Sequence, residues 1–279
     1  KIFFIEICYF YSYITFISHR VYLKFMTVQI NYKSTSSKKY PNKLVLFVDE
    51  NFTISGLKKH FLSKEFEYIS DLLKNSDKKK IIATYDISSK RKIILVSCKK
   101  KITSTEAESL GAKFYDHFKN DKQAKFTVNT DSSVSSLKNF IGFFLHGVKL
   151  KSYNFNKYKS KKDIKNFLIN IKGKNTPSFK DRIKFKAIEE GTYFARDLVS
   201  EPGNILHPDE YAKRLNSLKK IGLKINIYNE KKLKKLGMNT LLGVGQGSIR
   251  GSYLVTMEWN GLKNNIKPLA FVGKGVCFD

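Results

Sequence analysis

A lysine and an aspartate five positions apart, Lys274 and Asp279, are the residues of this chain best placed to do chemistry. The apolar run at 269–272 predicts a strand covered on both faces. Gly273 and Gly275 flank Lys274, and we expect the backbone to leave the sheet there. Side chains five positions apart on a regular strand point to opposite faces, so the two residues converge only if the glycines allow a turn. Because ligands bind at the carboxyl ends of strands in open α/β sheets, the pair is a candidate ligand-binding site.

Residues 272–279, Val-Gly-Lys-Gly-Val-Cys-Phe-Asp, resemble a motif of the leucyl (cytosol) aminopeptidases, a family of two-metal exopeptidases. The family motif is Val-Gly-Lys-Gly-(Ile/Val)-Thr-Phe-Asp, and its Lys and Asp are metal ligands. Lys274 and Asp279 fall on those two positions, whereas Cys277 stands where the family usually has Thr. An amine must lose a proton that it normally holds up to about pH 10.4 before it can bind a metal. A lysine ligand is therefore rare, and the match is specific.

Three further blocks carry the same resemblance, in the family's order. Residues 194–208 resemble the signature Ala-Arg-x-Leu-Val-Asn-x-Pro-x-Asn, with Ser200 in place of the usual Asn. Residues 236–248 match Gly-Met-x-x-Leu-Leu-x-Val-Gly-x-Gly-Ser. Residues 144–159 resemble the helix end and tyrosine-rich loop that close the family's amino-terminal domain. The resemblance therefore covers about the last half of the chain.

The resemblance implies a hydrolase: a metal-dependent aminopeptidase, or metallopeptidase, that releases leucine-like residues from the amino termini of peptide substrates. It implies two divalent metal ions per subunit, zinc or manganese, and a homo-hexamer. Lys274 and Asp279 are the metal ligands expected in this chain. The other ligands, a second catalytic lysine and a catalytic arginine are expected beyond Asp279, so we expect no catalytic residue here. We accordingly interpret the chain as a fragment that is inactive by itself and binds metal weakly.

The pattern of strands and helices predicts an α/β protein with two domains. An amino-terminal domain is expected at 26–158, and the resemblance implies that it is macro-like. A polar linker is expected at 159–180. Residues 181–279 are expected to form a linker helix and the incomplete first part of a three-layer α/β/α catalytic domain. The amino-terminal domain is expected to hold strands at 44–48, 81–84, 93–97 and 126–130, and helices from Thr103 and over 134–148.

The second half begins with a predicted helix over 181–200. Its expected apolar face is Ala187, Ile188, Gly191, Phe194, Ala195, Leu198 and Val199. Pro208 is expected to start a helix that stops at Gly222, with His207 packing against it or capping it. Strands are expected at 223–227, 241–244, 254–259 and 269–272, with a short helix that ends at Gly237.

Residues 2–17 are strongly apolar and aromatic, but Glu6 interrupts them and the run is shorter than the ~20 residues that a spanning helix needs. We interpret residues 1–25 as a non-native upstream extension, with Met26 as the true start, and expect no membrane partner. Three cysteines (Cys8, Cys98 and Cys277) without C-x-x-C spacing predict neither a disulfide framework nor a cysteine zinc site, and favour the cytoplasm.

The formal net charge of +28, from 52 Lys and Arg against 24 Asp and Glu, leaves two other functions open. One is a basic nucleic-acid-binding or regulatory module. The other is an inactive family member that serves as an assembly subunit. The lysines occur in short scattered runs, which solvated faces explain. Nucleotide-binding glycine motifs, H-E-x-x-H and G-x-S-x-G are all absent from the sequence, so it predicts no site of those classes.

Overall fold

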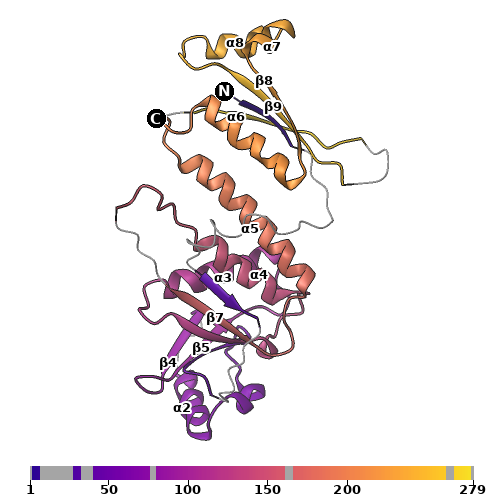
Figure 1. The fold of residues 1–279 in the computed structure, drawn as a ribbon. Coiled ribbons are helices and arrows are strands. Elements are labelled where there is room, and N and C mark those ends of the chain that lie inside the picture. Colours follow the sequence, from indigo (N-terminus) through magenta and orange to yellow (C-terminus); the bar gives the residue numbers. More distant parts are fainter. Residues whose placement is uncertain are drawn as a thin grey trace. The chain divides into compact units, whose positions relative to one another are not determined.

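The computed structural model describes residues 2–6, 28–32, 40–75, 80–160, 166–261 and 267–277. The chain divides into two compact units (Figure 1). One comprises residues 20–194, and the other comprises residues 1–19 together with 195–279. No helix in the part of the chain that the structure describes is long and apolar enough to cross a lipid bilayer.

The unit at 20–194 is built on a six-stranded sheet with the order β2-β7-β6-β3-β5-β4. All neighbouring strands run parallel except β4, which is antiparallel to β5. The mixed, mostly parallel sheet confirms the expected α/β class, and β3 to β6 lie at the four predicted strands. The strands are β2 Val28–Asn31, β3 Lys43–Val48, β4 Ile82–Asp86, β5 Lys92–Ser97, β6 Lys125–Asn129 and β7 Phe167–Lys172.

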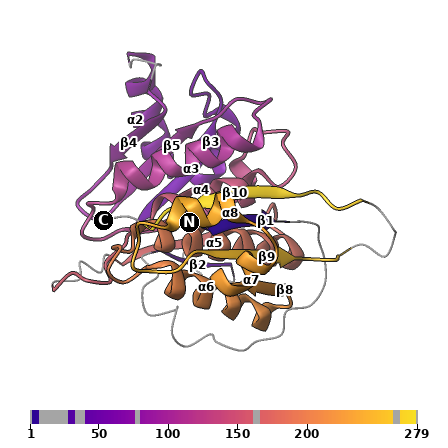
Figure 2. The same ribbon diagram turned by 90° about the horizontal axis from the view of Figure 1, so that it is seen from above.

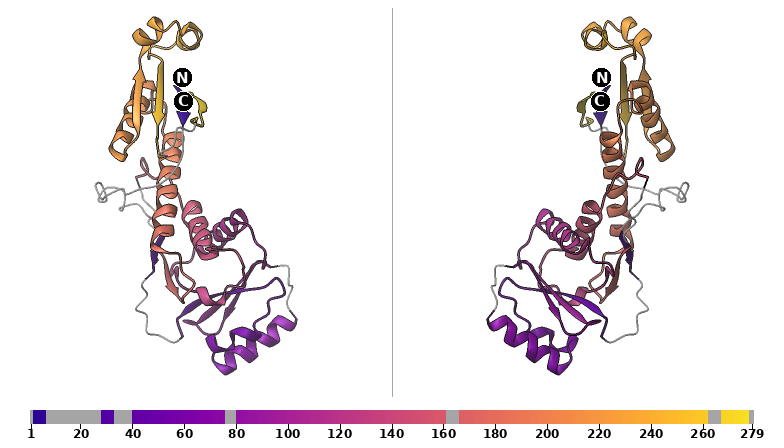
Figure 3. Two further views of the ribbon diagram at one scale, coloured as in Figure 1. Left: turned by 90° about the vertical axis from the view of Figure 1, so that its right-hand side faces the viewer. Right: turned by 90° about the vertical axis from the view of Figure 1, so that its left-hand side faces the viewer.

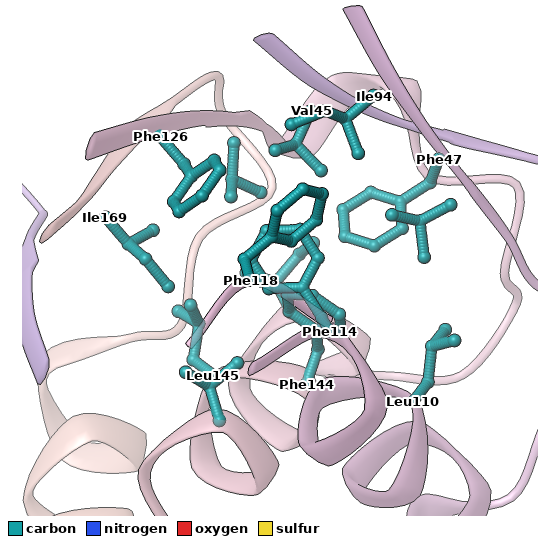
Figure 4. Close-up of a cluster of buried hydrophobic side chains, with 14 of the residues drawn as sticks. Val45, Phe47, Ile94, Leu110, Phe114, Phe118, Phe126, Phe144, Leu145 and Ile169 are labelled. Carbon is teal, nitrogen blue, oxygen red and sulfur yellow. The ribbon is translucent and has the colours of Figure 1, made fainter. Parts of the chain in front are cut away.

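Helices cover both faces of this sheet (Figure 3). On one face α3 and α4 enclose a cluster of phenylalanine rings, in which Phe114 and Phe144 pack against Phe47 and Phe126 of the sheet (Figure 4). On the other face α2 packs with a second apolar cluster. The helices and turns are η2 Ser55–His60, α2 Ser63–Lys74, α3 Ser104–Phe118, η3 Thr130–Ser132, α4 Phe140–Lys151 and α5 Phe179–Ser200.

The start of α3 has the predicted capping box. The backbone N–H of Glu106 donates to Thr103 Oγ1 at 3.2 Å, and Thr103 N–H donates to Glu106 Oε2 at 2.8 Å. Two groups that a helix end leaves without an internal partner are thus satisfied. The predicted buried residues of α3 are confirmed: Ala107, Leu110, Phe114 and Phe118.

Glycines let α3 and α4 approach until their backbones touch. A Cβ added to Gly111 of α3 would lie 1.9 Å from the carbonyl oxygen of Phe144. A Cβ added to Gly147 of α4 would lie 1.9 Å from the carbonyl oxygen of Glu108. The contact is reciprocal, so neither helix can accept a larger residue at its glycine without moving away from the other.

We expect Gly111→Ala to destabilise the unit by about 1–3 kcal/mol, because the added methyl group overlaps the backbone of α4. Gly191→Ala is the matched control, since nothing lies within 4 Å of a Cβ added at this position of α5. That change should stabilise the protein by about 0.5–1 kcal/mol through helix propensity. Urea unfolding followed by circular dichroism measures both; equal effects of the two substitutions would contradict the close contact.

A buried ion pair joins α2 to the turn between β4 and β5. Arg91 donates from Nε to Glu65 Oε1 at 2.9 Å and from a second nitrogen to Oε2 at 3.1 Å, and only 4% of the Glu65 side chain is exposed. Burial opposes ionisation of Glu65, but hydrogen bonds from Arg91 and from the backbone N–H of Leu62 outweigh it. The pKa of this carboxyl therefore lies below its usual 4.5.

We expect Glu65→Gln to cost roughly 3–5 kcal/mol of unfolding free energy at pH 7, because it leaves the charge of Arg91 buried without its carboxylate. A lowered pKa contributes stability above the unfolded-state value of about 4.3 and loses it as the pH falls through the folded-state value. The gap between wild type and variant should therefore shrink below about pH 4. Unfolding in urea at several pH values measures this. The exposed neighbour Glu67 gives the control Glu67→Gln, expected to lie within about 0.5 kcal/mol of wild type.

The second unit is built on a four-stranded sheet with the order β10-β1-β9-β8. Strand β1 pairs parallel to β9 and antiparallel to β10, so it lies between two strands that are consecutive in the chain. Helices α6 and α7 contact β8 and β9 (Figure 2). The elements are β1 Ile2–Glu6, α6 Pro208–Asn216, η4 Ser217–Ile221, β8 Lys224–Tyr228, α7 Glu230–Lys235, α8 Asn239–Gly245, β9 Tyr253–Glu258 and β10 Phe271–Gly275.

Several predictions for this unit are confirmed. Pro208 is the first residue of α6, and His207 caps that helix by accepting from the backbone N–H of Glu210. The following turn stops at Gly222, whose φ of 95° is open to glycine at little cost. The predicted strands at 223–227 and 254–259 correspond to β8 and β9.

The expected linker at 159–180 is wrong over Phe167–Lys172, which form β7 in the interior of the six-stranded sheet. Phe167, Ile169 and Ile171 alternate with less buried residues, so the strand signal was present inside a lysine- and asparagine-rich stretch. The helix expected from residue 134 begins at Phe140, because Asn139 adopts a left-handed conformation with φ 63°.

Two further expectations are overturned by packing. Residues 241–244 form part of helix α8, not a strand; an apolar run this short does not distinguish the two. The expected strand and turn at 269–275 are corrected below. Strand β1 was not predicted and lies within the stretch interpreted as an upstream extension; residues 7–27 lie outside the described part of the chain.

The buried face of α5 also differs from the prediction. Glu189 is its one fully buried residue, while Ile188 is 43% and Val199 is 87% exposed. The residues that pack on α4 are Phe185, Glu189 and Tyr193, which contact His146 and Lys149. The apolar pattern alone therefore pointed to the wrong side of this helix.

Candidate metal centre

Lys274 lies within β10, the edge strand of the four-stranded sheet. The ladder between β10 and β1 runs from Phe271 to Gly275 without a break, and Lys274 lies opposite Phe3. The expectation that the backbone leaves the sheet at the two glycines is therefore wrong, because both glycines take part in strand pairing. The side chain of Lys274 is exposed.

The predicted strand at 269–272 is likewise corrected in its position and its environment. It begins at Phe271, and its apolar residues are not covered: 48% of Phe271 and 71% of Val272 are exposed. Leu269 precedes the strand and is 56% exposed. Apolar content predicted burial on both faces, but both of these neighbouring apolar side chains of β10 are exposed.

Asp279, the second expected ligand, lies outside the described residues, so its distance from Lys274 stays untested. Within the part of the chain that the structure describes, no three His, Cys, Asp or Glu side chains come together in a way that could hold a metal ion. Lys274 is thus the one expected ligand with a described position. The described residues do not by themselves form a metal site, and we derive no catalytic step from one.

Asp209 contacts several segments that precede β10 in the chain. It accepts a hydrogen bond from the Tyr253 hydroxyl at 2.7 Å, from β9, and lies 3.4 Å from Arg250 in the loop before that strand. His207 Nδ1 lies 3.2 Å from the second carboxylate oxygen. The hydrogen bond to Asp209, aided by burial, raises the pKa of Tyr253 to about 12. This network fixes the start of β9 against the start of α6.

Cys277, which replaces the family's usual Thr, is half-buried close to the site motif. Burial raises the pKa of its thiol. The thiol therefore stays protonated at neutral pH and fits the small apolar replacement that the sequence suggested.

Arg214 of α6 holds the end of the signature block at 194–208. It donates to Glu201 at 2.9 Å and to Glu210 at 3.1 Å, and the Glu201 side chain is only 2% exposed. Burial opposes protonation of Arg214, but the hydrogen bonds to these two carboxylates outweigh it and raise its pKa. This cation serves the fold of the block, because the Glu201 carboxylate is buried beside it.

The carboxyl-terminal part of the chain, residues 193–279, is similar to known proteins. Residues 193–279 match the sequence profile described as "Cytosol aminopeptidase family, catalytic domain". This part of the chain belongs to the cytosol aminopeptidase family. The match includes Lys274 and the whole of the motif at 272–279.

Curated cytosol aminopeptidases extend the similarity upstream of the profile. A probable cytosol aminopeptidase from Chelativorans sp. (strain BNC1) is 46% identical over 140 residues, which cover 48% of this chain and 28% of that protein. One from Phytoplasma mali (strain AT) is 43% identical over 153 residues, 53% of this chain and 31% of that protein. The matched stretch thus spans less than a third of either relative.

Several solved structures share the fold. A mutant of tomato leucine aminopeptidase has a TM-score of 0.60 at 20% identity, covering 75% of this chain and 46% of that one. Cytosol aminopeptidase from Coxiella burnetii has a TM-score of 0.60 at 16% identity, with coverages of 85% and 47%. Bottromycin maturation enzyme BotP in complex with Mn has a TM-score of 0.58 at 16% identity, with coverages of 78% and 45%. At these identities the likeness shows the fold alone.

We expect Arg214→Met to destabilise the second unit by roughly 3 kcal/mol, because it removes the cation beside the buried Glu201 carboxylate. The double variant Arg214→Met, Glu201→Met should recover most of that loss, since apolar residues of similar volume replace both charges. Fluorescence of Trp259, the sole tryptophan, reports on this unit during urea unfolding. A double variant no more stable than the single one would contradict the pairing.

Proposed function

We propose that this chain is part of a metal-dependent aminopeptidase that removes leucine-like residues from the amino termini of peptides. The observation that carries the proposal is the family match over 193–279, which ends in the motif that holds Lys274 and Asp279. The 46% identity to a curated relative, over 140 residues, supports it. In this proposal Lys274 would ligate one of two divalent metals, zinc or manganese, and Asp279 would belong to the bridged pair. The metals would supply an activated water and polarise the scissile carbonyl.

The finer architecture is part of the same proposal. We infer that the unit at 20–194 is the macro-like amino-terminal domain and that residues 195–279 open a three-layer α/β/α catalytic domain. The relatives' name, cytosol aminopeptidase, supports a cytoplasmic location, and family resemblance supports a homo-hexamer in the complete enzyme. The matched stretch covers under a third of those relatives, so most of their catalytic sequence has no counterpart in the matched region.

The first expected outcome concerns the chain of 279 residues by itself. Purified and supplied with Mn²⁺ or Zn²⁺, it should release no measurable leucine from leucine p-nitroanilide, because two ligands complete neither a closed nor a catalytic site. Absorbance of released nitroaniline measures this. Metal-dependent release above the metal-only blank would show that the described residues, with Asp279, suffice for catalysis.

The second outcome tests Lys274 in a complete domain. A chimera joins this chain to the sequence that follows the matched stretch in the Chelativorans protein; it should release leucine when a divalent metal is present. Lys274→Ala in that chimera should lower kcat/KM by about 10³-fold or more, a loss of ~4 kcal/mol in transition-state stabilisation. Lys267→Ala, an exposed lysine just before the strand, is the control and should leave the rate unchanged. Full activity of Lys274→Ala would remove Lys274 from the ligand set.

The net charge of +28 keeps a nucleic-acid-binding or regulatory module as a second candidate. Phosphate contacts would make affinity fall steeply as salt rises. Filter binding of duplex DNA between 50 and about 200 mM salt separates the two: no affinity at low salt removes this candidate. An inactive assembly subunit is the third candidate function. It is favoured only if the chimera with unchanged Lys274 and Lys267 assembles but stays inactive.

A further inference from the structure

The edge strand β4 offers unpaired backbone groups along its outer side. Ser97 N–H donates to the carbonyl of Ile81, and Ile87 N–H donates to that of Arg91, so the odd-numbered residues face β5. In an antiparallel ladder the intervening residues point their N–H and C=O groups the other way. Ile82, Thr84 and Asp86 therefore face outward, and β4 is the last strand in the order of the sheet. No described strand pairs with that edge.

A hollow of about 490 Å³ adjoins the carboxyl end of this edge. Its apolar lining comes from Leu62, Tyr68 and Ile87, and the first two side chains are 47% and 50% exposed. Ser63, Lys64, Glu65 and Asp86 complete it. A strand added along β4 could therefore place an apolar side chain in the hollow.

The described charged side chains without a charged partner at this edge are lysines. The carboxylates of the hollow are already held, since Glu65 pairs with Arg91 at 2.9 Å and Asp86 with Lys92 at 2.7 Å. Lys64 has no charged partner among the described residues. Lys80 and Lys90, before and after β4, are exposed and likewise have none in the described part of the chain. Among the residues that line the hollow or flank β4, the charges without a charged partner in the described part of the chain are thus positive.

We propose that β4 and the hollow form a docking surface for an extended acidic peptide segment, which adds a strand to the sheet. Its backbone pairs with Ile82, Thr84 and Asp86, a large apolar side chain fills the hollow, and acidic residues on either side meet Lys64, Lys80 and Lys90. Backbone pairing supplies the affinity, while the hollow and the lysines select the sequence. The surface lies within residues 20–194 and does not depend on the aminopeptidase proposal.

The test uses the full chain and a fluorescein-labelled synthetic peptide, Asp-Glu-Val-Thr-Val-Phe-Val-Glu-Asp, followed by fluorescence anisotropy at low salt. Thr84→Pro removes the outward N–H and blocks pairing, and proline is tolerated on the free side of an edge strand. It should weaken binding about tenfold or more, whereas Thr84→Val, which keeps the N–H, should change it less than about twofold. Tyr68→Ser should weaken binding about fivefold by removing an apolar wall of the hollow.

Other outcomes are also decisive. A peptide with lysine in place of each acidic residue should not bind. If the acidic peptide fails to bind, or binds Thr84→Pro and wild type equally, the docking surface is wrong and any affinity reflects general basicity. Light scattering that shows a dimer of the free chain, lost in Thr84→Pro, would assign the edge to a second copy and overturn the proposal.

A second readout covers the case in which Thr84→Pro fails to fold. Amide hydrogen exchange of the wild-type chain, with and without the peptide, reports the outward groups directly. Ile82, Thr84 and Asp86 should gain protection when the peptide is bound, since their N–H groups become hydrogen bonded. The inward-facing amides of Ala83 and Tyr85 should change little, because they already pair with β5. Unchanged exchange at the three outward amides would contradict strand addition.

Discussion

The backbone contact between α3 and α4 is the constraint on which the unit at 20–194 depends. Gly111 and Gly147 each meet a carbonyl of the opposite helix, so the two helices lie closer than side chains would allow. The short distance between the helices determines where Phe114 and Phe144 pack on the sheet. Their rings fill the core against Phe126 and Phe47. One pair of missing Cβ atoms thus sets the spacing of the two helices.

Helix α4, held in this way, is the platform for α5. Phe185 packs over Gly142 and His146, and Glu189 lies 3.5 Å from Lys149, with both side chains nearly buried. Burial raises the pKa of Glu189 and lowers that of Lys149, and the attraction between the two groups opposes both shifts. A polar interface with such geometry contributes orientation more than stability, because desolvation offsets the attraction. Helix α5 is therefore positioned by specific partners and leaves its apolar residues exposed.

In the second unit, ion pairs and hydrogen bonds add to an apolar core in which Leu215, Ile225 and Val255 are buried. Asp209 accepts hydrogen bonds from Tyr253 and Arg250, and Arg214 joins α6 to Glu201. These contacts give the charged residues of the signature block a structural role. They bring the segments before β10 into order, while Lys274 itself stays on an exposed edge strand.

The sequence by itself determined the family, the α/β class and most strands, because buried parallel strands are continuous apolar runs, and the Lys-Gly motif requires particular side chains at fixed spacing. Capping at Thr103 and His207 was also legible, since caps depend on neighbours three residues away. Only tertiary structure decided which side of α5 is buried, that β7 lies within the sheet, and that Lys274 continues a strand. Each of these depends on partners far apart in the sequence: Lys149 for Glu189, β2 and β6 for β7, and β1 for β10. Local pattern specifies what an element can be, whereas its burial and register are set by the surface that it meets.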